Sequence, residues 1–251
     1  MKLTNRNILV TGAASGIGLE VIKLFADEGA RLAIAAREQS DAEQALALCR
    51  HPERHVAVSG DLTDADAVTA LTDCAVATLG KIDGLVHSAG VDHIAPFAET
   101  SNADFQRVLN QNLTSAFLIC QATAPHIEAA GGGTMVTMAS GAALLPLAGR
   151  TAYCAAKAGL VMFSKTLALE LASAKIRVNA LCPGAIDTPM LRASAGGEFG
   201  DPVPAEVVSR FAMGRIGLPD EIARATLFLS SEDSSFVTGA ALTADGGRTF
   251  H

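Results

Sequence analysis

The sequence has no run of basic residues and no long apolar run, and each absence excludes a class of protein. Its 19 Lys and Arg residues are scattered among 26 Asp and Glu residues, and the net charge is −7. A nucleic-acid-binding surface needs clustered positive charge, so nucleic acid is not an expected partner. The first apolar stretch, residues 8–10, is far too short for a secretory signal core or a membrane span. We therefore expect a cytoplasmic protein without a membrane partner.

Paired cysteines are also lacking. The five cysteines form no C-x-x-C pair and lie in apolar segments, at Cys49, Cys74, Cys120, Cys154 and Cys182. We interpret them as reduced thiols that pack as small hydrophobes, and no metal site is predicted. Cys154 stands beside Tyr153, where a reactive thiol is one reading, but a buried structural thiol is the identity that its neighbours favour.

Short apolar runs alternate with longer segments of helical periodicity along the chain. Seven of these runs are predicted strands: residues 8–10, 32–36, 56–59, 84–87, 134–139, 176–181 and 240–243. Such alternation predicts an α/β fold with a mainly parallel sheet, helices on both faces and ligands at the carboxyl ends of the strands. With 251 residues, the chain is expected to form a single domain, 1–251. The glycine- and proline-rich residues 193–204 predict a loop, and we expect a substrate lid around 188–214.

A glycine-rich segment follows the first predicted strand. Gly12, Gly16 and Gly18 stand there, and a helical apolar period begins at Ile17 and ends at Gly29. Glycines in a strand-to-helix turn let the backbone approach a pyrophosphate, and the helix amino terminus supplies free N–H groups. The segment therefore predicts a dinucleotide-binding turn, although loose glycine patterns also occur in plain turns.

The end of the second predicted strand bears on the choice of cofactor. Folds specific for NAD usually place a carboxylate near this point to bind the ribose, whereas the 2′-phosphate of NADP needs a cation. Ala36 supplies no acid, and Arg37 offers a fork of donors suited to phosphate. We therefore expect NADP in preference to NAD; the alternative is that Arg37 only faces solvent.

Tyr153 is the only tyrosine in the chain, and it precedes Lys157 by four residues. On a helix this spacing places both side chains on one face. The ordinary pKa of a phenol is near ~10, and a fixed ammonium group within about 4–6 Å lowers it by roughly 1–3 units. The pair thus predicts acid–base chemistry. The competing interpretation is a surface helix whose lysine stem lies along apolar surface.

Two further polar residues stand at places where they need partners. Asn112 interrupts a helical apolar stripe over residues 105–120, so its amide is expected in a hydrogen-bond network, either structural or catalytic. Ser140 follows the fifth predicted strand, at the edge where ligands bind. A serine before glycine is compatible with turn chemistry or with catalysis.

Taken together, these residues resemble the motifs of the short-chain dehydrogenase/reductase family, in its compact single-domain branch. The resemblance covers nearly the whole chain and rests on residues in the family's order and spacing: Thr11, Gly12, Gly16, Gly18, Asn112, Ser140, Tyr153, Lys157, Pro183, Gly184 and Thr188. It implies a doubly wound, Rossmann-type parallel sheet of about seven strands. It also implies a nicotinamide-dependent oxidoreductase that forms a homo-oligomer, a tetramer or a dimer.

The resemblance also implies the site residues. The implied catalytic residues are Asn112, Ser140, Tyr153 and Lys157. The implied cofactor-binding residues are Gly12, Ser15, Gly16, Ile17, Gly18, Arg37, Asp61, Leu62, Ser88, Ala89, Gly90, Tyr153, Lys157, Pro183, Gly184, Ile186 and Thr188. Among these, Asp61 and Leu62 are expected at the adenine, and Ile186 and Thr188 at the nicotinamide carboxamide.

The chain departs from the family pattern after the fourth predicted strand. The family typically has Asn-Asn-Ala-Gly there, and this chain has His87, Ser88, Ala89 and Gly90. A hydroxyl and an imidazole must therefore replace two amides. We expect Ser88 to reach the cofactor, and we interpret His87 as a hydrogen-bonded core histidine rather than a catalytic one.

The predicted reaction is interconversion of a secondary alcohol and a ketone by hydride transfer. Tyr153 would exchange the proton, Lys157 would stabilise the phenolate, Ser140 would hold the substrate oxygen and Asn112 would position a relay water. One rival is a cofactor-sensing module without chemistry, which would be expected to lack members of this set. A sugar-nucleotide epimerase is disfavoured by the glycine spacing and the short C-terminal half.

The sequence indicates the substrate only weakly. Residues 144–147 predict an apolar wall beside Ser140, whereas His93 and Arg150 are candidates for contact with a polar substrate. A 3-oxoacyl thioester on an acidic carrier protein is the alternative substrate. Because residues 126–131 contain no Lys or Arg, a small free ketone, polyol or hydroxy compound is favoured.

Overall fold

The computed structural model describes residues 1–195, 201 and 203–249. In this part of the chain seven strands form one parallel sheet in the order β3-β2-β1-β4-β5-β6-β7. The strands are β1 (Asn7–Thr11), β2 (Arg31–Ala36), β3 (Val56–Ser59), β4 (Gly84–His87), β5 (Gly133–Met138), β6 (Ile176–Pro183) and β7 (Ala241–Ala244). The order reverses between β1 and β4, which makes this boundary the switch point where such sheets bind ligands.

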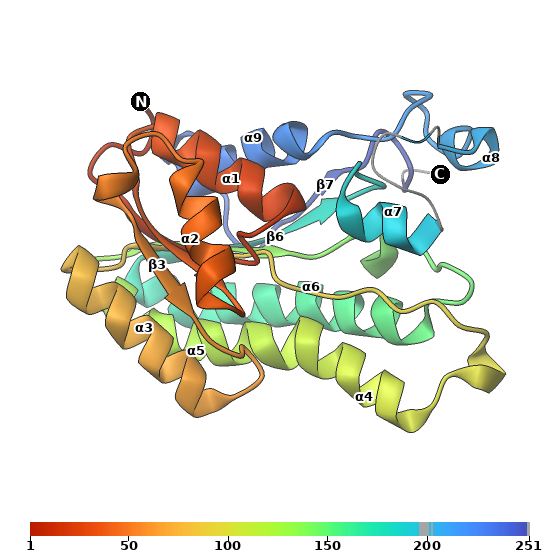
Figure 1. Ribbon diagram of the computed structural model, residues 1–251, viewed down its shortest axis with the longest axis horizontal. Helices are drawn as coiled ribbons and strands as arrows, with labels where there is room; N and C mark the ends of the chain where they lie inside the picture. The colour runs from red at the N-terminus through yellow and green to blue at the C-terminus, as the bar shows by residue number, and fades with distance from the viewer. Residues whose placement is uncertain (196–200, 202, 250–251) are drawn as a thin grey trace.

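Helices cover both faces of the sheet (Figure 1). One face carries α1 (Gly16–Asp27), α2 (Gln39–Ala47) and α9 (Pro219–Ser230). The other carries α3 (Ala65–Leu79), α4 (Asn102–Leu109), α5 (Ser115–Ala129) and α6 (Thr151–Leu171). Two shorter helices, α7 (Pro189–Ala195) and α8 (Ala205–Val208), lie beyond β6 and β7 at one end of the sheet (Figure 1).

The central strands are buried along their whole length because both faces of the sheet are covered. All five residues of β1 and all four of β4 are buried. One apolar cluster joins the sheet to α1 and α9, and includes Phe25 and Ile222. A second joins it to α3, α5 and α6, and includes Leu71 and Ile119. The core therefore forms two layers around a sheet whose carboxyl edge is left for the site.

The predicted fold class is confirmed. All seven predicted strands are present, with ends within two residues of the prediction. The predicted lid segment contains α7 and α8, but its residues 196–200 and 202 lie outside the described part of the chain, so the lid stays a prediction. Among the described residues, none of the helices combines the length and the apolar character needed to cross a membrane.

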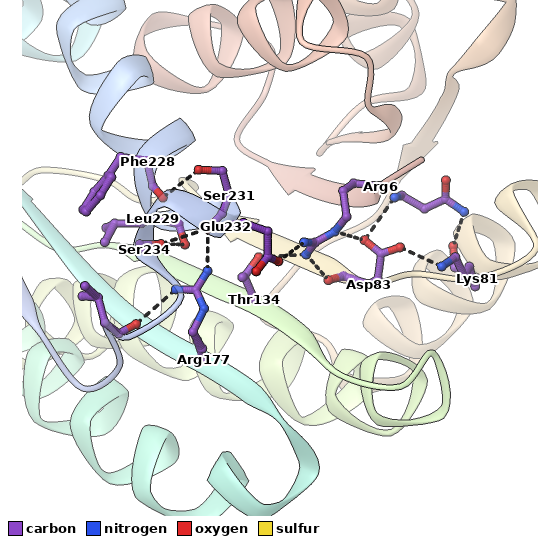
Figure 2. A network of polar contacts seen from close by, with 12 residues as sticks. Arg6, Lys81, Asp83, Thr134, Arg177, Phe228, Leu229, Ser231, Glu232 and Ser234 are labelled. Atoms are coloured by element: carbon purple, nitrogen blue, oxygen red, sulfur yellow. Dashed lines mark hydrogen bonds and ion pairs between the residues drawn. The ribbon is translucent and has the colours of Figure 1, made fainter. Parts of the chain in front are cut away.

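A polar network ties the elements together at the opposite, amino edge of the sheet (Figure 2). Arg6 Nε lies 2.6 Å from Asp83 Oδ1, and its Nη2 donates to Asp83 O at 2.9 Å. Arg177 donates to the carbonyl oxygens of Ser231 and Val237 at 2.9 and 3.1 Å. A cavity of about 520 Å³ adjoins these residues, far from the carboxyl edge. Because Asp83 is 4% exposed, the network is structural in character.

Removing the Asp83 carboxylate is expected to destabilise the fold. The Asp83→Ala variant leaves Arg6 with only the exposed Glu232 as an ion-pair partner, at 3.8 Å, and the Asn7 N–H without its acceptor at 3.2 Å. Breaking a buried pair on one side costs about 3–5 kcal/mol in the free energy of unfolding, measured here by urea denaturation. The control is Asp220→Ala, because the exposed Asp220–Arg224 pair should contribute less than about 1 kcal/mol. Equal losses in the two variants would contradict this account.

Candidate active site

The glycine turn between β1 and α1 lies against the loop after β4. Gly12 adopts φ +65°, and a Cβ atom added there would lie 2.6 Å from Ala89 N. A Cβ atom at Gly18 would lie 2.1 Å from Gly12 O. Both positions therefore require glycine, because any larger residue would force apart the first strand, the first helix and the β4 loop. The turn is built as the sequence predicted.

The amino terminus of α1 is free to bind an anion. Ser15 occupies the N-cap position, but its hydroxyl makes no capping hydrogen bond, and the first turn, which contains Ile17, has no acidic residue. A Cβ atom added at Gly16 would lie 3.2 Å from Thr188 Cγ2. The glycine turn and the loop after β6 thus meet, although Gly16 and Thr188 are distant in sequence. Unpaired N–H groups here would favour a phosphate.

The loop after β6 brings the remaining predicted residues to this edge. Pro183 pairs in register with Ala244 of β7, and Gly184 N donates to Ala244 O at 3.2 Å. Ile186 and Thr188 are buried, and the Thr188 hydroxyl donates to Ile186 O at 3.2 Å. Thr188 lies against Gly16, so this loop and the glycine turn meet at the carboxyl edge; nicotinamide binding by Ile186 and Thr188 stays a prediction.

His87 is a buried, neutral histidine within the sheet. Its Nδ1 lies 2.9 Å from the Thr11 hydroxyl oxygen, and its Nε2 lies 3.4 Å from that of Ser115. Burial, and secondarily the charge of Lys157, lowers the pKa of His87 to about 3. The interpretation of His87 as a hydrogen-bonded core residue is therefore confirmed. The neighbouring Ser88 is half-buried at the edge, where its backbone N–H donates to Thr11 O at 3.3 Å.

Asn112 lies in a π-helical turn, η3 (Asn110–Thr114), between α4 and α5. The sequence predicted a continuous helical stripe, and the π turn breaks that period. The buried amide donates to Val91 O and Val108 O, both at 2.9 Å, and accepts from Val91 N at 3.3 Å. Because both amide donors are used, a water held by this residue would have to bond to Oδ1 or to a backbone carbonyl. The amide fixes the backbone next to Gly90.

Ser140, Tyr153 and Lys157 come together beside this amide. The Ser140 side chain lies close enough to Tyr153 to lower the pKa of the phenol, and Lys157 Nζ lies 5.6 Å from the centroid of the tyrosine ring. Lys157 Nζ also donates to Met138 O at 2.8 Å. A Cβ atom added at Gly90 would lie 3.3 Å from Lys157 Nζ and 2.5 Å from the side-chain oxygen of Asn112. The structure therefore brings all four predicted catalytic residues to one place.

Burial dominates the electrostatics of the tyrosine–lysine pair. It raises the pKa of Tyr153 from 10.0 to about 12, and the nearby Ser140 side chain acts in the opposite direction. Burial also lowers the pKa of Lys157 from 10.5 to about 8. The sequence-based expectation that Lys157 lowers the pKa of Tyr153 is therefore wrong for the protein without its cofactor, because burial raises this pKa by more than Ser140 and Arg150 lower it.

The predicted adenine-binding residues lie at the far end of the same edge. Arg37 follows β2, Asp61 follows β3, and Arg37 Nη2 lies 3.7 Å from Asp61 Oδ2. Both side chains are exposed, at 60% and 46%. A hydrogen bond from Thr63 holds the pKa of Asp61 below its usual value. Leu62 packs on the apolar layer beneath, so it is available as an adenine contact.

The sequence did not single out Asp92 and Ser194. Asp92 Oδ2 accepts from Arg150 Nε at 2.9 Å and from the Ser194 hydroxyl at 3.0 Å. Arg150 and the neighbouring His93 were identified as candidate substrate contacts, but the acid that pairs with Arg150 is 58 residues away from it. The one feature of the sequence that could have identified Asp92 as a site residue is its position between Gly90 and His93.

Comparison with known proteins places this geometry in a family. A family model described as enoyl-(acyl carrier protein) reductase matches residues 12–249. The chain is 40% identical over 250 residues to D-threitol dehydrogenase of Mycolicibacterium smegmatis, covering 99% of this chain and 94% of that protein. It is 39% identical over 245 residues to cis-4-hydroxycyclohexanecarboxylate dehydrogenase of Sinomonas cyclohexanicum, covering 97% and 96%.

A solved structure shows the same fold at full length. The 3-ketoacyl-(acyl-carrier-protein) reductase of Brucella melitensis, complexed with NADH, superposes with a TM-score of 0.91 at 33% identity. The match covers 99% of this chain and 100% of that chain. The seven-stranded parallel sheet, the glycine turn and these matches agree. The chain belongs to the short-chain dehydrogenase/reductase family, whose members are oxidoreductases that act on CH–OH groups.

Proposed function

We propose that Asn112, Ser140, Tyr153 and Lys157 interconvert a secondary alcohol and a ketone with a nicotinamide cofactor. The observation that carries this proposal is the convergence at the carboxyl edge of the sheet. Ser140 lies near enough to the phenol to lower its pKa, the lysine lies 5.6 Å from the same ring, and the Gly90 backbone lies beside both Lys157 and Asn112. The glycine turn, the uncapped start of α1 and the loop after β6 fit a dinucleotide beside them. When bound, the cofactor supplies the hydride acceptor or donor.

Each residue has a role that its contacts support. In the oxidation direction the Tyr153 phenolate takes the hydroxyl proton while hydride leaves the same carbon. Ser140 donates a hydrogen bond to the substrate oxygen, and the Lys157 ammonium stabilises the phenolate. Asn112 holds the Val91 backbone through two hydrogen bonds and so keeps the Gly90 loop against the lysine. In the reduction direction the neutral phenol is the proton donor.

The substrate proposed is a small free ketone, polyol or hydroxy compound. Two relatives named as dehydrogenases of a polyol and of a hydroxycyclohexanecarboxylate support it. A 3-oxoacyl thioester is the second candidate, favoured by the Brucella melitensis reductase at 33% identity. The deciding experiment measures turnover of polyols, cyclic alcohols, small diketones and acetoacetyl thioesters with NADP and NAD. Turnover of thioesters alone would overturn the first choice, and no turnover at all would favour a cofactor-sensing module.

NADP is proposed as the preferred cofactor because of Arg37. The guanidinium is exposed where β2 ends, and its only ion pair among the described residues is the 3.7 Å contact with Asp61. A surface pair of this kind contributes about 0–1 kcal/mol, so the arginine can leave Asp61 for a 2′-phosphate. NAD remains the alternative, since Asp61 itself is a carboxylate near the ribose position.

Replacement of Arg37 is expected to change cofactor preference. In Arg37→Ala, kcat/KM for NADP should fall by about 10–100-fold, because a charge-assisted hydrogen bond to the phosphate is lost, whereas kcat/KM for NAD should change little. Steady-state kinetics with both cofactors provide the measurement. Arg224→Ala, which removes an exposed arginine of α9, serves as the control. A wild-type enzyme that prefers NAD, or parallel losses for both cofactors, would refute the assignment.

A homo-oligomer, tetramer or dimer, and a cytoplasmic location are also proposed. The helices α5 and α6 leave large apolar side chains exposed, at Phe117, Met162 and Leu169. Exposed apolar side chains on adjacent helices favour a subunit contact. All five cysteines are free thiols, which agrees with a reducing compartment.

A further inference from the structure

Asp92 joins three separate segments next to the proposed catalytic residues. It lies in the loop after β4 and pairs with Arg150, the residue before α6, and with Ser194 on α7. Its other carboxylate oxygen accepts from the His93 backbone N–H at 2.8 Å. The side chains of Asp92 and Arg150 are 13% and 22% exposed. Burying an ion pair costs desolvation free energy that the attraction between the two charges often does not recover. Fold stability alone therefore does not explain this pair, which has a third partner on α7.

The pair lies close enough to act on the reacting group. Arg150 precedes Tyr153 by less than one helical turn, and the charges of Asp92 and Arg150 shift the pKa of the phenol in opposite directions. The Asp92 loop also begins at Gly90, whose neighbour is Lys157. A substrate whose reacting oxygen contacts Tyr153 and Ser140 would therefore have the Asp92–Arg150 pair beside its adjoining carbons.

The hydrogen-bonding groups of Asp92 and Arg150 suit a hydroxyl group of the substrate. The carboxylate offers further acceptor positions, and within the described residues the two Nη atoms of Arg150 have no hydrogen-bond partner. A hydroxyl both donates and accepts, so it can bond to acid and guanidinium at once. An acyl chain would leave the remaining acceptor positions of Asp92 and the two Nη atoms of Arg150 without hydrogen bonds. A carboxylate substrate would be repelled by Asp92 and would find Arg150 already neutralised.

We infer that Asp92, Arg150 and Ser194 form a hydroxyl-recognition site that selects small polyols, which carry a second hydroxyl next to the reacting one. This inference rests on the proposed function, because it requires oxidation of a secondary alcohol at Tyr153. It narrows the substrate class and names the residues that determine specificity. Ser194 places one of these contacts on α7, so the polyol would bind between the body of the protein and that helix.

The test compares three alcohols that differ in their second hydroxyl and in their charge. D-Threitol carries adjacent hydroxyls, cyclohexanol carries one, and cis-4-hydroxycyclohexanecarboxylate adds a negative charge. In Asp92→Asn, kcat/KM for D-threitol should fall about tenfold or more, because one hydrogen bond to a charged acceptor is lost. For the carboxylate it should rise by a similar factor, since Arg150 becomes free to pair with it. Cyclohexanol should change little.

Arg150→Gln provides the opposite charge change and keeps the proposal testable if one variant folds poorly. It should also weaken D-threitol oxidation, but it should lower rather than raise activity on the carboxylate, because Asp92 is then unneutralised. Asp104→Asn is the matched control, an exposed acid paired with Arg107 at 3.5 Å. Calorimetric binding of D-threitol to NADP-loaded Tyr153→Phe, with and without Asp92→Asn, separates recognition from chemistry; the second change should weaken binding.

The outcomes distinguish failure of the proposed function from failure of the hydroxyl-recognition site. If the wild-type protein turns over none of the polyols, cyclic alcohols, diketones and thioesters of the substrate panel, the proposed function fails, and the inference with it. If it turns over other members of the panel but not D-threitol, only the inference fails. If it oxidises cyclohexanol as well as D-threitol, or if Asp92→Asn lowers all three activities equally, only the inference is overturned. Opposite shifts for D-threitol and the carboxylate in the two variants would support it, since a merely structural role would not change sign with charge.

Discussion

Replacing Tyr153 with phenylalanine is expected to lower kcat by about 10²–10⁴-fold while leaving cofactor binding nearly unchanged. The substitution removes one oxygen atom, which is the proton donor and acceptor, and keeps the ring that packs against Val108 and Ala156. Turnover is measured with the best substrate from the panel, and cofactor affinity by fluorescence titration. Thr166→Val on the exposed side of the same helix removes a hydroxyl without touching the site and serves as the control. A Tyr153→Phe variant with wild-type turnover would refute the mechanism.

The proposed roles of Tyr153 and Lys157 also predict how the rate of the wild-type enzyme depends on pH. With the pKa of Tyr153 raised to about 12, the phenol is protonated at pH 7 and ready to donate in ketone reduction. Alcohol oxidation needs the phenolate, so its rate should rise with pH from neutrality. Above about pH 8 the rise should weaken, because Lys157 begins to lose the charge that stabilises the phenolate. Ketone reduction should not rise with pH over this range, and an oxidation rate that falls from pH 6 to 8 would contradict the assignment.

Replacing Lys157 with methionine is expected to abolish most turnover and to stabilise the protein at neutral pH. The lysine is 4% exposed, and burial lowers its pKa from 10.5 to about 8. At ~1.36 kcal/mol per pKa unit, this corresponds to about 3 kcal/mol against the buried ammonium. Loss of the charged hydrogen bond to Met138 O offsets about 1.5–3 kcal/mol, so the free energy of unfolding should rise by up to about 1.5 kcal/mol.

The sign of this effect with pH follows from the two pKa values. Below pH 8 the lysine is charged in both the folded and the unfolded chain, and the burial penalty is fully present. Between about pH 8 and 10.5 the folded state loses the proton first, so the wild-type protein recovers stability and the difference from Lys157→Met should shrink. Urea denaturation at pH 7 and pH 10 measures this difference. Lys165→Met, an exposed lysine on α6, is the control, and destabilisation at pH 7 would contradict the account.

The local features of this protein could be read from the sequence. The seven strands, the glycine turn at Gly12 and the four-residue spacing of Tyr153 and Lys157 all depend on periods or spacings within one segment. Each of these patterns has a direct geometric meaning, because side chains repeat every two residues in a strand and every 3.6 residues in a helix. The order of the residues along the chain was also enough to identify the family. The grouping of the predicted site residues was therefore largely predictable, whereas their roles in binding and catalysis stay predictions.

Contacts between segments depended on the tertiary structure. The Asp92–Arg150 and Arg6–Asp83 pairs join residues 58 and 77 positions apart, and no local pattern links such partners. The π turn at Asn112 also escaped the sequence, because it inserts one residue into an otherwise regular helical stripe. The direction of the Tyr153 pKa was mispredicted since spacing reports a neighbouring charge but not the loss of solvent around it. The sequence by itself thus determined which reactive groups this protein has and their order along the chain. Tertiary packing determined how far these groups are shielded from solvent and which charged side chains from distant segments lie beside them.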